Sequence, residues 1–139
     1  MANTTYTLDV VTPERVMLSD QVISTVAPGS EGVLEVLAEH APLMTELVAG
    51  EVRVTLADGR TTSHIVVSGG FMEVSMTRTT ILADSAERVD EIDVTRAEED
   101  LAAARRLLAE AEQGSPEALR AQQAETYAEA KLRVGRDGR

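Results

Sequence analysis

Along residues 6–83, apolar and polar residues alternate in short runs, which is the pattern of strands that bury one face. Turn-forming residues separate the runs, above all the cluster at 28–32 and the Asp58-Gly59 pair, a strong hairpin signal. The pattern predicts strands near residues 6–11, 16–18, 22–27, 33–37, 52–56, 62–67, 71–76 and 79–83. Because no helical pattern separates these strands, they predict an antiparallel β-sandwich or flattened barrel rather than a parallel α/β fold.

Beyond residue 91 the apolar pattern takes a helical period, and strand-forming residues almost disappear. Asp93 stands at the N-cap position of the first predicted helix. Gly114 and Pro116 mark the turn into a second helix, since glycine fits past a C-terminus and proline fits a first helical position. That second helix is predicted to end near Val134, before a tail that should fray. The first helix carries a narrow apolar stripe made of Val94, Ala97, Leu101, Ala104, Leu108 and Ala111.

The apolar stripe of the second helix is mostly alanine, at positions 118, 121, 124 and 128. An alanine seam removes much less apolar surface from water than a leucine seam, so we expect the two helices to pack closely but weakly. The fold class is therefore α+β, an N-terminal antiparallel β-sandwich followed by a C-terminal antiparallel α-helical hairpin. We assign residues 1–86 to the sandwich, 87–92 to an acidic and solvated hinge, and 93–139 to the hairpin.

Charge and composition narrow the function. The formal net charge is −11, which argues against binding nucleic acid or anionic lipid through a basic patch. The chain has no cysteine, which excludes disulfides, thiolate catalysis and cysteine-ligated zinc. It has no apolar run of the roughly 20 residues needed to cross a bilayer. We therefore expect no nucleic acid partner and no direct membrane insertion.

The sequence offers little catalytic chemistry. His40 and His64 are the only histidines and are far apart in sequence, so no metal site is predicted. Neither a Gly-x-Ser-x-Gly elbow nor a Walker lysine is present. The acids of the hinge are crowded on one segment, whereas a hydrolytic pair needs two walls of a cleft. We expect a protein that binds partners and is not an enzyme; a free-standing β-sandwich adaptor or assembly chaperone with a coiled-coil arm, and a small hydrolase, are the alternatives.

Four groups of residues, in this order and at these separations, form a specific pattern: LDVVTP at 8–13, GSEG at 29–32 with HAPL at 40–43, VSGGFMEV at 67–74, and ILADSAER at 81–88. The pattern resembles the epsilon subunit of the bacterial F-type, proton-translocating ATP synthase. The resemblance implies a β-sandwich at the foot of the central stalk, bound to the gamma subunit and resting on the c ring. It also implies a peripheral location at the cytoplasmic face of the plasma membrane.

For the hairpin, the resemblance implies two positions. Folded down, the hairpin lies against the sandwich; extended, it reaches the alpha–beta head and inhibits ATP hydrolysis. The subunit turns with the rotor and couples proton flow to ATP synthesis, without catalysing a reaction itself. It requires no cofactor, although the family implies ATP as a weak regulatory ligand.

The nucleotide motif of some bacterial relatives is present as IDVTRA at 92–97. The resemblance implies a nucleotide site made of Glu87, Ile92, Asp93, Arg96 and Ala97, together with Arg133 of the second helix. Ala103 stands where nucleotide-binding relatives carry another arginine, and the second helix offers only Arg120, Lys131 and Arg133 as cations, with acids between them. We therefore expect weak ATP binding at most.

The segment that would face the ring and stalk also departs from the family pattern. The resemblance assigns this contact to Glu31, Gly32, Val33 and His40. Relatives often have Gly-x-x-Pro-Gly-His where this chain has EVLAEH at 35–40, which removes glycine and adds acids. His40 carries over by position, whereas Val33 occupies a site that is often acidic.

Overall fold

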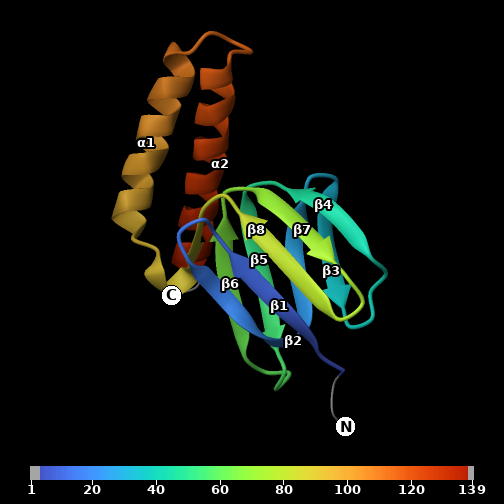
Figure 1. Cartoon of the computed structure of the whole chain (residues 1–139). Helices are drawn as coiled ribbons and strands as arrows, with labels where there is room; N and C mark the ends of the chain where they lie inside the picture. The colour runs from blue at the N-terminus through green and yellow to red at the C-terminus, as the bar shows by residue number, and fades with distance from the viewer. Residues whose placement is uncertain (1–3, 138–139) are drawn as a thin grey trace.

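A computed structural model describes residues 4–137 and divides into a β-sandwich and a helical hairpin that projects from one end of it (Figure 1). Among these residues there are nine strands, one 3₁₀ turn and two helices. The elements are β1 Tyr6–Val11, β2 Val16–Gly29, β3 Gly32–Leu37, β4 Leu43–Leu47, β5 Gly50–Leu56, β6 Thr62–Val67, β7 Gly70–Val74, β8 Arg78–Ala83, β9 Ala86–Arg88, η1 Val89–Glu91, α1 Val94–Glu110 and α2 Pro116–Asp137. The predicted α+β class is confirmed.

The strands form one sheet that folds over on itself. Its order is β1-β8-β7-β4-β2-β5-β6-β9, with β3 also paired to β2, and it closes where β1 pairs with β2. All the strand pairs described are antiparallel except β1 with β8, which is parallel and was not predicted. The strand β2 spans 14 residues and pairs in turn with β1, β5, β3 and β4, so it links the two layers of the sandwich.

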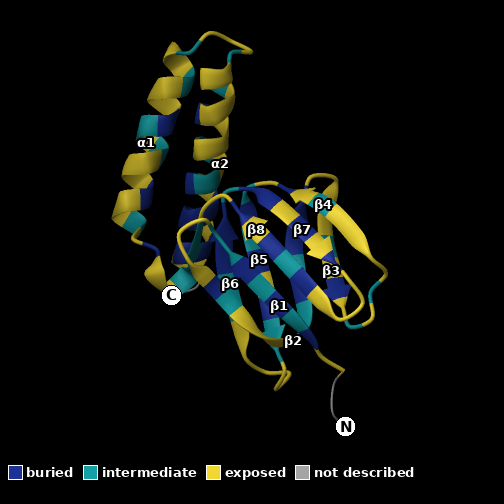
Figure 2. Cartoon of the chain, in the orientation of Figure 1, coloured by how far each residue is buried: buried dark blue, intermediate teal, exposed yellow. Residues whose placement is uncertain are grey.

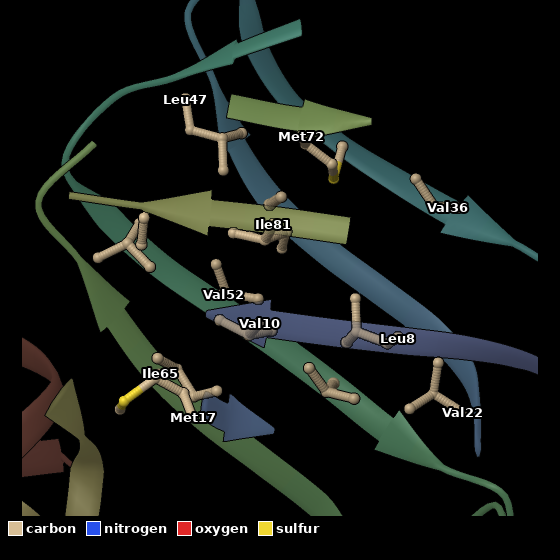
Figure 3. Packing of buried hydrophobic residues seen from close by; sticks show 14 of the residues in the cluster. Leu8, Val10, Met17, Val22, Val36, Leu47, Val52, Ile65, Met72 and Ile81 are labelled. Atoms are coloured by element: carbon tan, nitrogen blue, oxygen red, sulfur yellow. The ribbon is translucent and has the colours of Figure 1, made fainter. Parts of the chain in front are cut away.

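The interior of the sandwich is filled by aliphatic side chains that point toward one another from facing strands (Figure 3). Leu8 and Val10 are fully buried while their neighbours in β1 are half-buried, which confirms the alternation expected from the sequence. Tyr6 places its only polar atom inside this core. Its hydroxyl donates to the carbonyl of Val36 at 2.8 Å and lies 2.7 Å from Oγ1 of Thr25, so the buried oxygen is satisfied.

The helix boundaries follow the predicted signals. The Asp93 carboxylate accepts a hydrogen bond from the amide of Arg96 at 3.1 Å, and the Ser115 hydroxyl accepts one from the amide of Ala118 at the same distance. Gly114 takes a positive φ of 81° between the helices. The predicted end of the second helix near Val134 is wrong, because α2 continues to Asp137. Gly135 lies inside the helix and permits close packing: an added Cβ would lie 2.9 Å from a methyl group of Ile92.

The segment at 87–92, which the sequence suggests is a solvated connector, is ordered and paired. Residues 86–88 form β9 and pair with β6, and the next three residues form η1. Ile92 is 1% exposed and packs against the hairpin. The segment is therefore not a fully solvated connector in this structure, because Glu87 and Glu91 have partners within the fold, as described below, while Asp90 is exposed.

Candidate functional site

The hairpin packs against the sandwich near its base, where α2 contacts β5, β6 and η1 (Figure 1). A small apolar cluster joins the two parts there: Val66 of β6, Ile92, and Ala130 and Val134 of α2, with Val89 and Tyr127 at its edge. The far halves of both helices are largely exposed (Figure 2). The base of the hairpin is thus the place where its position relative to the sandwich is determined.

Lys131, the only lysine of the chain, lies within this junction. Its side chain is 8% exposed, and its ammonium lies 3.1 Å from Oε1 of Glu87 and 3.6 Å from Oδ2 of Asp100. Nζ also stands 4.4 Å from the centre of the Tyr127 ring, a favourable position for a cation over an aromatic face. One ammonium therefore connects three elements, since Glu87 belongs to β9, Asp100 to α1 and Lys131 to α2.

The side chain of Tyr127 is half-buried at this junction. Burial raises the pKa of its hydroxyl well above the ordinary value of 10, and the nearby negative charge of Glu87 raises it further. The phenol therefore stays neutral at every physiological pH. The ring contributes an apolar wall beside the Lys131 ammonium.

A second ion pair fixes the segment that leads into the hairpin. The guanidinium of Arg15 donates two hydrogen bonds to the carboxylate of Glu91, at 2.9 and 2.8 Å. These bonds, followed by one from the backbone amide of Arg88, lower the pKa of Glu91 from 4.5 to about 2. Arg88 also donates to the carbonyl of Met17 at 2.7 Å. Two basic side chains thus hold β9 and η1 against the sandwich.

The residues predicted for nucleotide binding have different roles in the structure. Ile92 and Ala97 are each 1% exposed and serve packing. Asp93 caps α1, and Glu87 pairs with Lys131. The guanidinium of Arg96 has no ion pair among residues 4–137 and lies on an exposed position of the first turn of α1. This leaves Arg96 as the cation of the motif that is free to meet an anion.

Arg133 does not lie on the same side of α2 as Lys131. Two residues correspond to about 200° around a helix, so the two side chains point in nearly opposite directions. Arg133 lines a cavity of about 480 Å³ with Glu51, Arg53 and His64 on the outer face of β5 and β6. In that cavity Nδ1 of His64 is 2.8 Å from Glu51.

The structure also shows what sequence reasoning missed at this site. The resemblance counts Lys131 among the few cations that the second helix offers, whereas the structure pairs it with two carboxylates of the same chain. Its isolation as the only lysine, among the buried alanines of α2, was the available signal. The partners could not be found in that way, because Glu87 is 44 positions from Lys131 in sequence.

The residues predicted for ring and stalk contact lie at two ends of one strand. Glu31 lies in the turn between β2 and β3, Gly32 begins β3, and Val33 follows with 76% of its surface exposed. His40 comes after the other end of β3, with its Nδ1 2.7 Å from the carbonyl of Ala41. The length of β3 separates the two groups by about 17 Å. The turn and the histidine therefore belong to different parts of the surface.

An apolar patch covers the outer face of β4, β7 and β8. Met44, Phe71 and Leu82 are 68%, 55% and 55% exposed, and Phe71 stands directly opposite Leu82 in the strand register. The three side chains line one shallow hollow together with Glu73 and Thr80. Exposed apolar side chains that cluster on one face of a small protein favour a role of that face in protein contact. The sequence motifs at 67–74 and 81–88 contain Phe71 and Leu82 but do not predict that these side chains form a patch with Met44.

Residues 4–137 contain neither a metal-binding cluster nor a membrane-spanning helix. No group of three metal-ligating side chains is present among them. No helix among them combines the length and the apolar character that crossing a bilayer requires.

The sandwich matches a known protein family. The family model described as the ATP synthase delta/epsilon chain beta-sandwich domain matches residues 5–89. The chain is 52% identical over 93 residues to the ATP synthase epsilon chain of Desulforamulus reducens, an alignment that covers 67% of this chain and 69% of the relative. It is 45% identical over 106 residues to the ATP synthase epsilon chain of Brucella canis, covering 76% and 78%.

Among solved structures, the chain is similar to one in the Euglena gracilis mitochondrial ATP synthase, OSCP/F1/c-ring, with a TM-score of 0.77 at 22% identity. That match covers 94% of this chain and 81% of the other. A chain in the central stalk and c ring of the Tetrahymena thermophila mitochondrial ATP synthase matches with a TM-score of 0.58 at 13% identity, covering 99% and 98%. At these identities the two likenesses concern the fold.

Proposed function

Because the chain belongs to the ATP synthase delta/epsilon family, whose members are non-catalytic subunits, we propose that it is a rotor subunit in the central stalk of a bacterial F-type ATP synthase. In this role it turns with the stalk and couples proton flow to ATP synthesis. It works at the cytoplasmic face of the plasma membrane, attached through other subunits. Family membership favours this function over the free-standing adaptor, the assembly chaperone and the small hydrolase.

The observation that carries the proposal is the agreement between the family match and the exposed apolar patch. The family model covers the sandwich, and the sandwich carries Met44, Phe71 and Leu82 on one outer face. Such a patch would be covered in an assembly, which supports stable docking of the sandwich on the stalk. We assign the gamma subunit to this face and the c ring to the turn that carries Glu31, Gly32 and Val33.

The hairpin has a different role in this proposal. Its far half packs mainly on itself, and Leu107 and Leu119 are 59% and 57% exposed near its tip. Their exposure supports contact with the alpha–beta head when the hairpin is extended. In that position the hairpin inhibits ATP hydrolysis, and in the docked position it does not.

Co-purification with the gamma subunit tests the docking face. Replacing the half-exposed phenyl ring in Phe71→Glu adds a charge at the centre of the patch, so we expect gamma recovery to fall by more than about tenfold. Leu119→Glu is the matched control, because Leu119 has nearly the same exposure but lies near the tip of the hairpin. Equal recovery with both variants would refute the assignment of this face. Recovery of no gamma subunit with the unmodified chain would refute the proposed function.

A further inference from the structure

We propose that Lys131 is the latch of the docked hairpin, an internal cation that holds α1 and α2 against the sandwich without any external ligand. The proposal rests on the regulatory role proposed above for the hairpin and names the contact that controls it. The latch consists of Lys131, Glu87 and Asp100, with Tyr127 beside the ammonium.

The position of this contact distinguishes it from the other ion pairs of the chain. Among residues 4–137, the ion pairs of the hairpin other than those of Lys131 connect the two helices or lie within α2. The pair between Lys131 and Glu87 is the one that joins a helix to a strand of the sandwich. Breaking any other of these pairs therefore removes no direct charge contact between a helix and the sandwich.

The remaining attachment is weak. The apolar cluster at the junction receives one side chain from the sheet, Val66, and its helix α2 contributes Ala130 and Val134. Among the described residues this cluster holds four buried side chains, against sixteen in the core of the sandwich, so it stabilises docking far less than the core stabilises the sandwich. A buried charge contact can therefore decide between the docked and the undocked hairpin.

Lys131 also offsets the repulsion between two carboxylates, which would destabilise docking if the lysine were replaced. Glu87 and Asp100 share one ammonium, and their side chains are 33% and 46% exposed. Without the cation, two carboxylates from β9 and α1 would face each other in a chain of net charge −11. Loss of Lys131 thus removes an attraction and leaves like charges together, which disfavours docking.

The experiment measures docking directly in the full chain. Because the chain has no cysteine, Val48→Cys and Gln123→Cys provide two specific sites for spin labels. Val48, before β5, and Gln123, in α2, line the same cavity of about 310 Å³ between the sandwich and the hairpin. Electron–electron distance measurements should give one short distance for the docked hairpin and a longer one after undocking.

In this labelled background, Lys131→Met should increase the undocked population about tenfold relative to the unmodified sequence, since it keeps the aliphatic stem and removes the charge. Lys131→Arg should restore the short distance, because the guanidinium can still meet both carboxylates. Arg120→Met is the matched control, as it removes a cation of the same helix whose partner, Glu117, lies within α2. The control should leave the distance distribution unchanged.

Circular dichroism of the strands verifies that the sandwich remains folded in every variant. If Lys131→Met and Arg120→Met give the same short distance, the latch is refuted. If Lys131→Arg gives the same undocked population as Lys131→Met, a positive charge at this position does not hold the hairpin. That result would also refute the latch. Because the measurement uses the isolated chain, its failure is separate from a failure of gamma co-purification, which would refute the stalk function instead.

Discussion

The sandwich and the hairpin bury different kinds of residue. Large side chains such as Leu8, Ile65 and Ile81 are fully buried in the sandwich. In α1 the buried positions are Ala97 and Ala104, and in α2 the buried apolar positions are Ala121, Ala128 and Ala130 together with Leu132 and Val134. A buried leucine contributes about 1.5–3 kcal/mol, whereas alanine contributes much less. The sandwich is therefore a platform with a fixed shape, and the hairpin is a part that can be moved by small changes in free energy.

The junction between the two parts follows from this difference. A large apolar interface would lock the hairpin in place, but the junction holds only a small cluster around Ile92. Ion pairs supply the other contacts at the junction. Lys131 of the hairpin pairs with Glu87, and Arg15 of the sandwich pairs with Glu91, just before the hairpin. A contact of this kind can be broken without disturbing the core of either part.

The largest expected effect comes from the core of the sandwich. Ile81 is fully buried and its neighbour Leu82 is 55% exposed, so the two adjacent positions of β8 provide a matched pair. Ile81→Ala should lower the free energy of unfolding by about 2–5 kcal/mol, because it leaves a cavity among well-packed side chains. Leu82→Ala should change it by less than about 0.5 kcal/mol. Denaturant titration measures both, and equal losses would contradict the description of the sandwich as the rigid platform.

The second prediction separates the two parts. A chain that ends at residue 91 should stay soluble and unfold cooperatively, since the core lies within the sandwich. In the assembled enzyme it should leave coupled ATP synthesis largely intact and change the rate of ATP hydrolysis. Thermal unfolding and the two activity assays test these outcomes. A truncated chain without a sharp transition, or loss of synthesis because the stalk fails to assemble, would show that the hairpin is part of the platform.

Much of this architecture is predictable from local patterns. Alternation identifies β5, and the Asp58-Gly59 pair predicts the return strand β6. Asp93 and Gly114 mark helix ends, because caps and turns depend on neighbouring residues. The continuity of β2 was not predictable. Its 14 residues pass between layers and change partners, so no single buried face runs along it.

The contacts of the junction depend on residues that are distant in sequence. Arg15 and Glu91 are 76 positions apart, and Lys131 is 44 positions from Glu87. Acid-rich composition at 87–92 therefore suggests a solvated hinge, although the fold brings basic partners to Glu87 and Glu91. Single-sequence reasoning identifies these charged residues but not their pairing.

The third prediction concerns pH. The pKa of Glu91 in the folded chain is about 2, below its ordinary value of 4.5, so folding favours its ionised form. The resulting stabilisation is complete above about pH 4.5 and is lost as the pH falls toward 2. Because the pair is partly exposed, we expect its contribution to stay below about 1 kcal/mol.

Glu91→Gln tests this contribution. The variant should be less stable than the unmodified chain at pH 6, and the difference should shrink as the pH falls toward 2. Glu117→Gln is a suitable control, because Glu117 pairs with Arg120 at an exposed position within α2. A difference that stays constant across this range would show that the ion pair of Glu91 with Arg15 does not stabilise the junction.

The smallest expected effect is nucleotide binding. Arg96 is free to meet a phosphate, but Glu87 is already paired with Lys131 and Arg133 lies on the other side of α2. Ala103 supplies no charge. Each charge-assisted hydrogen bond contributes about 1.5–3 kcal/mol, so a site with one free arginine should bind ATP at millimolar concentration or without measurable heat.

Calorimetric titration of ATP into the full chain, into Arg96→Ala and into Arg106→Ala tests this prediction. Arg106 is the matched control, since it lies in α1 and, like Arg96, has no ion pair among the described residues. Micromolar binding that disappears in Arg96→Ala would show that ATP displaces the internal contacts of the junction. Binding that Arg96→Ala leaves unchanged would place the site elsewhere. The expected absence of tight binding would mean that the position of the hairpin depends on the chain's own cation, because the carboxylate that a nucleotide site would use is already engaged by Lys131.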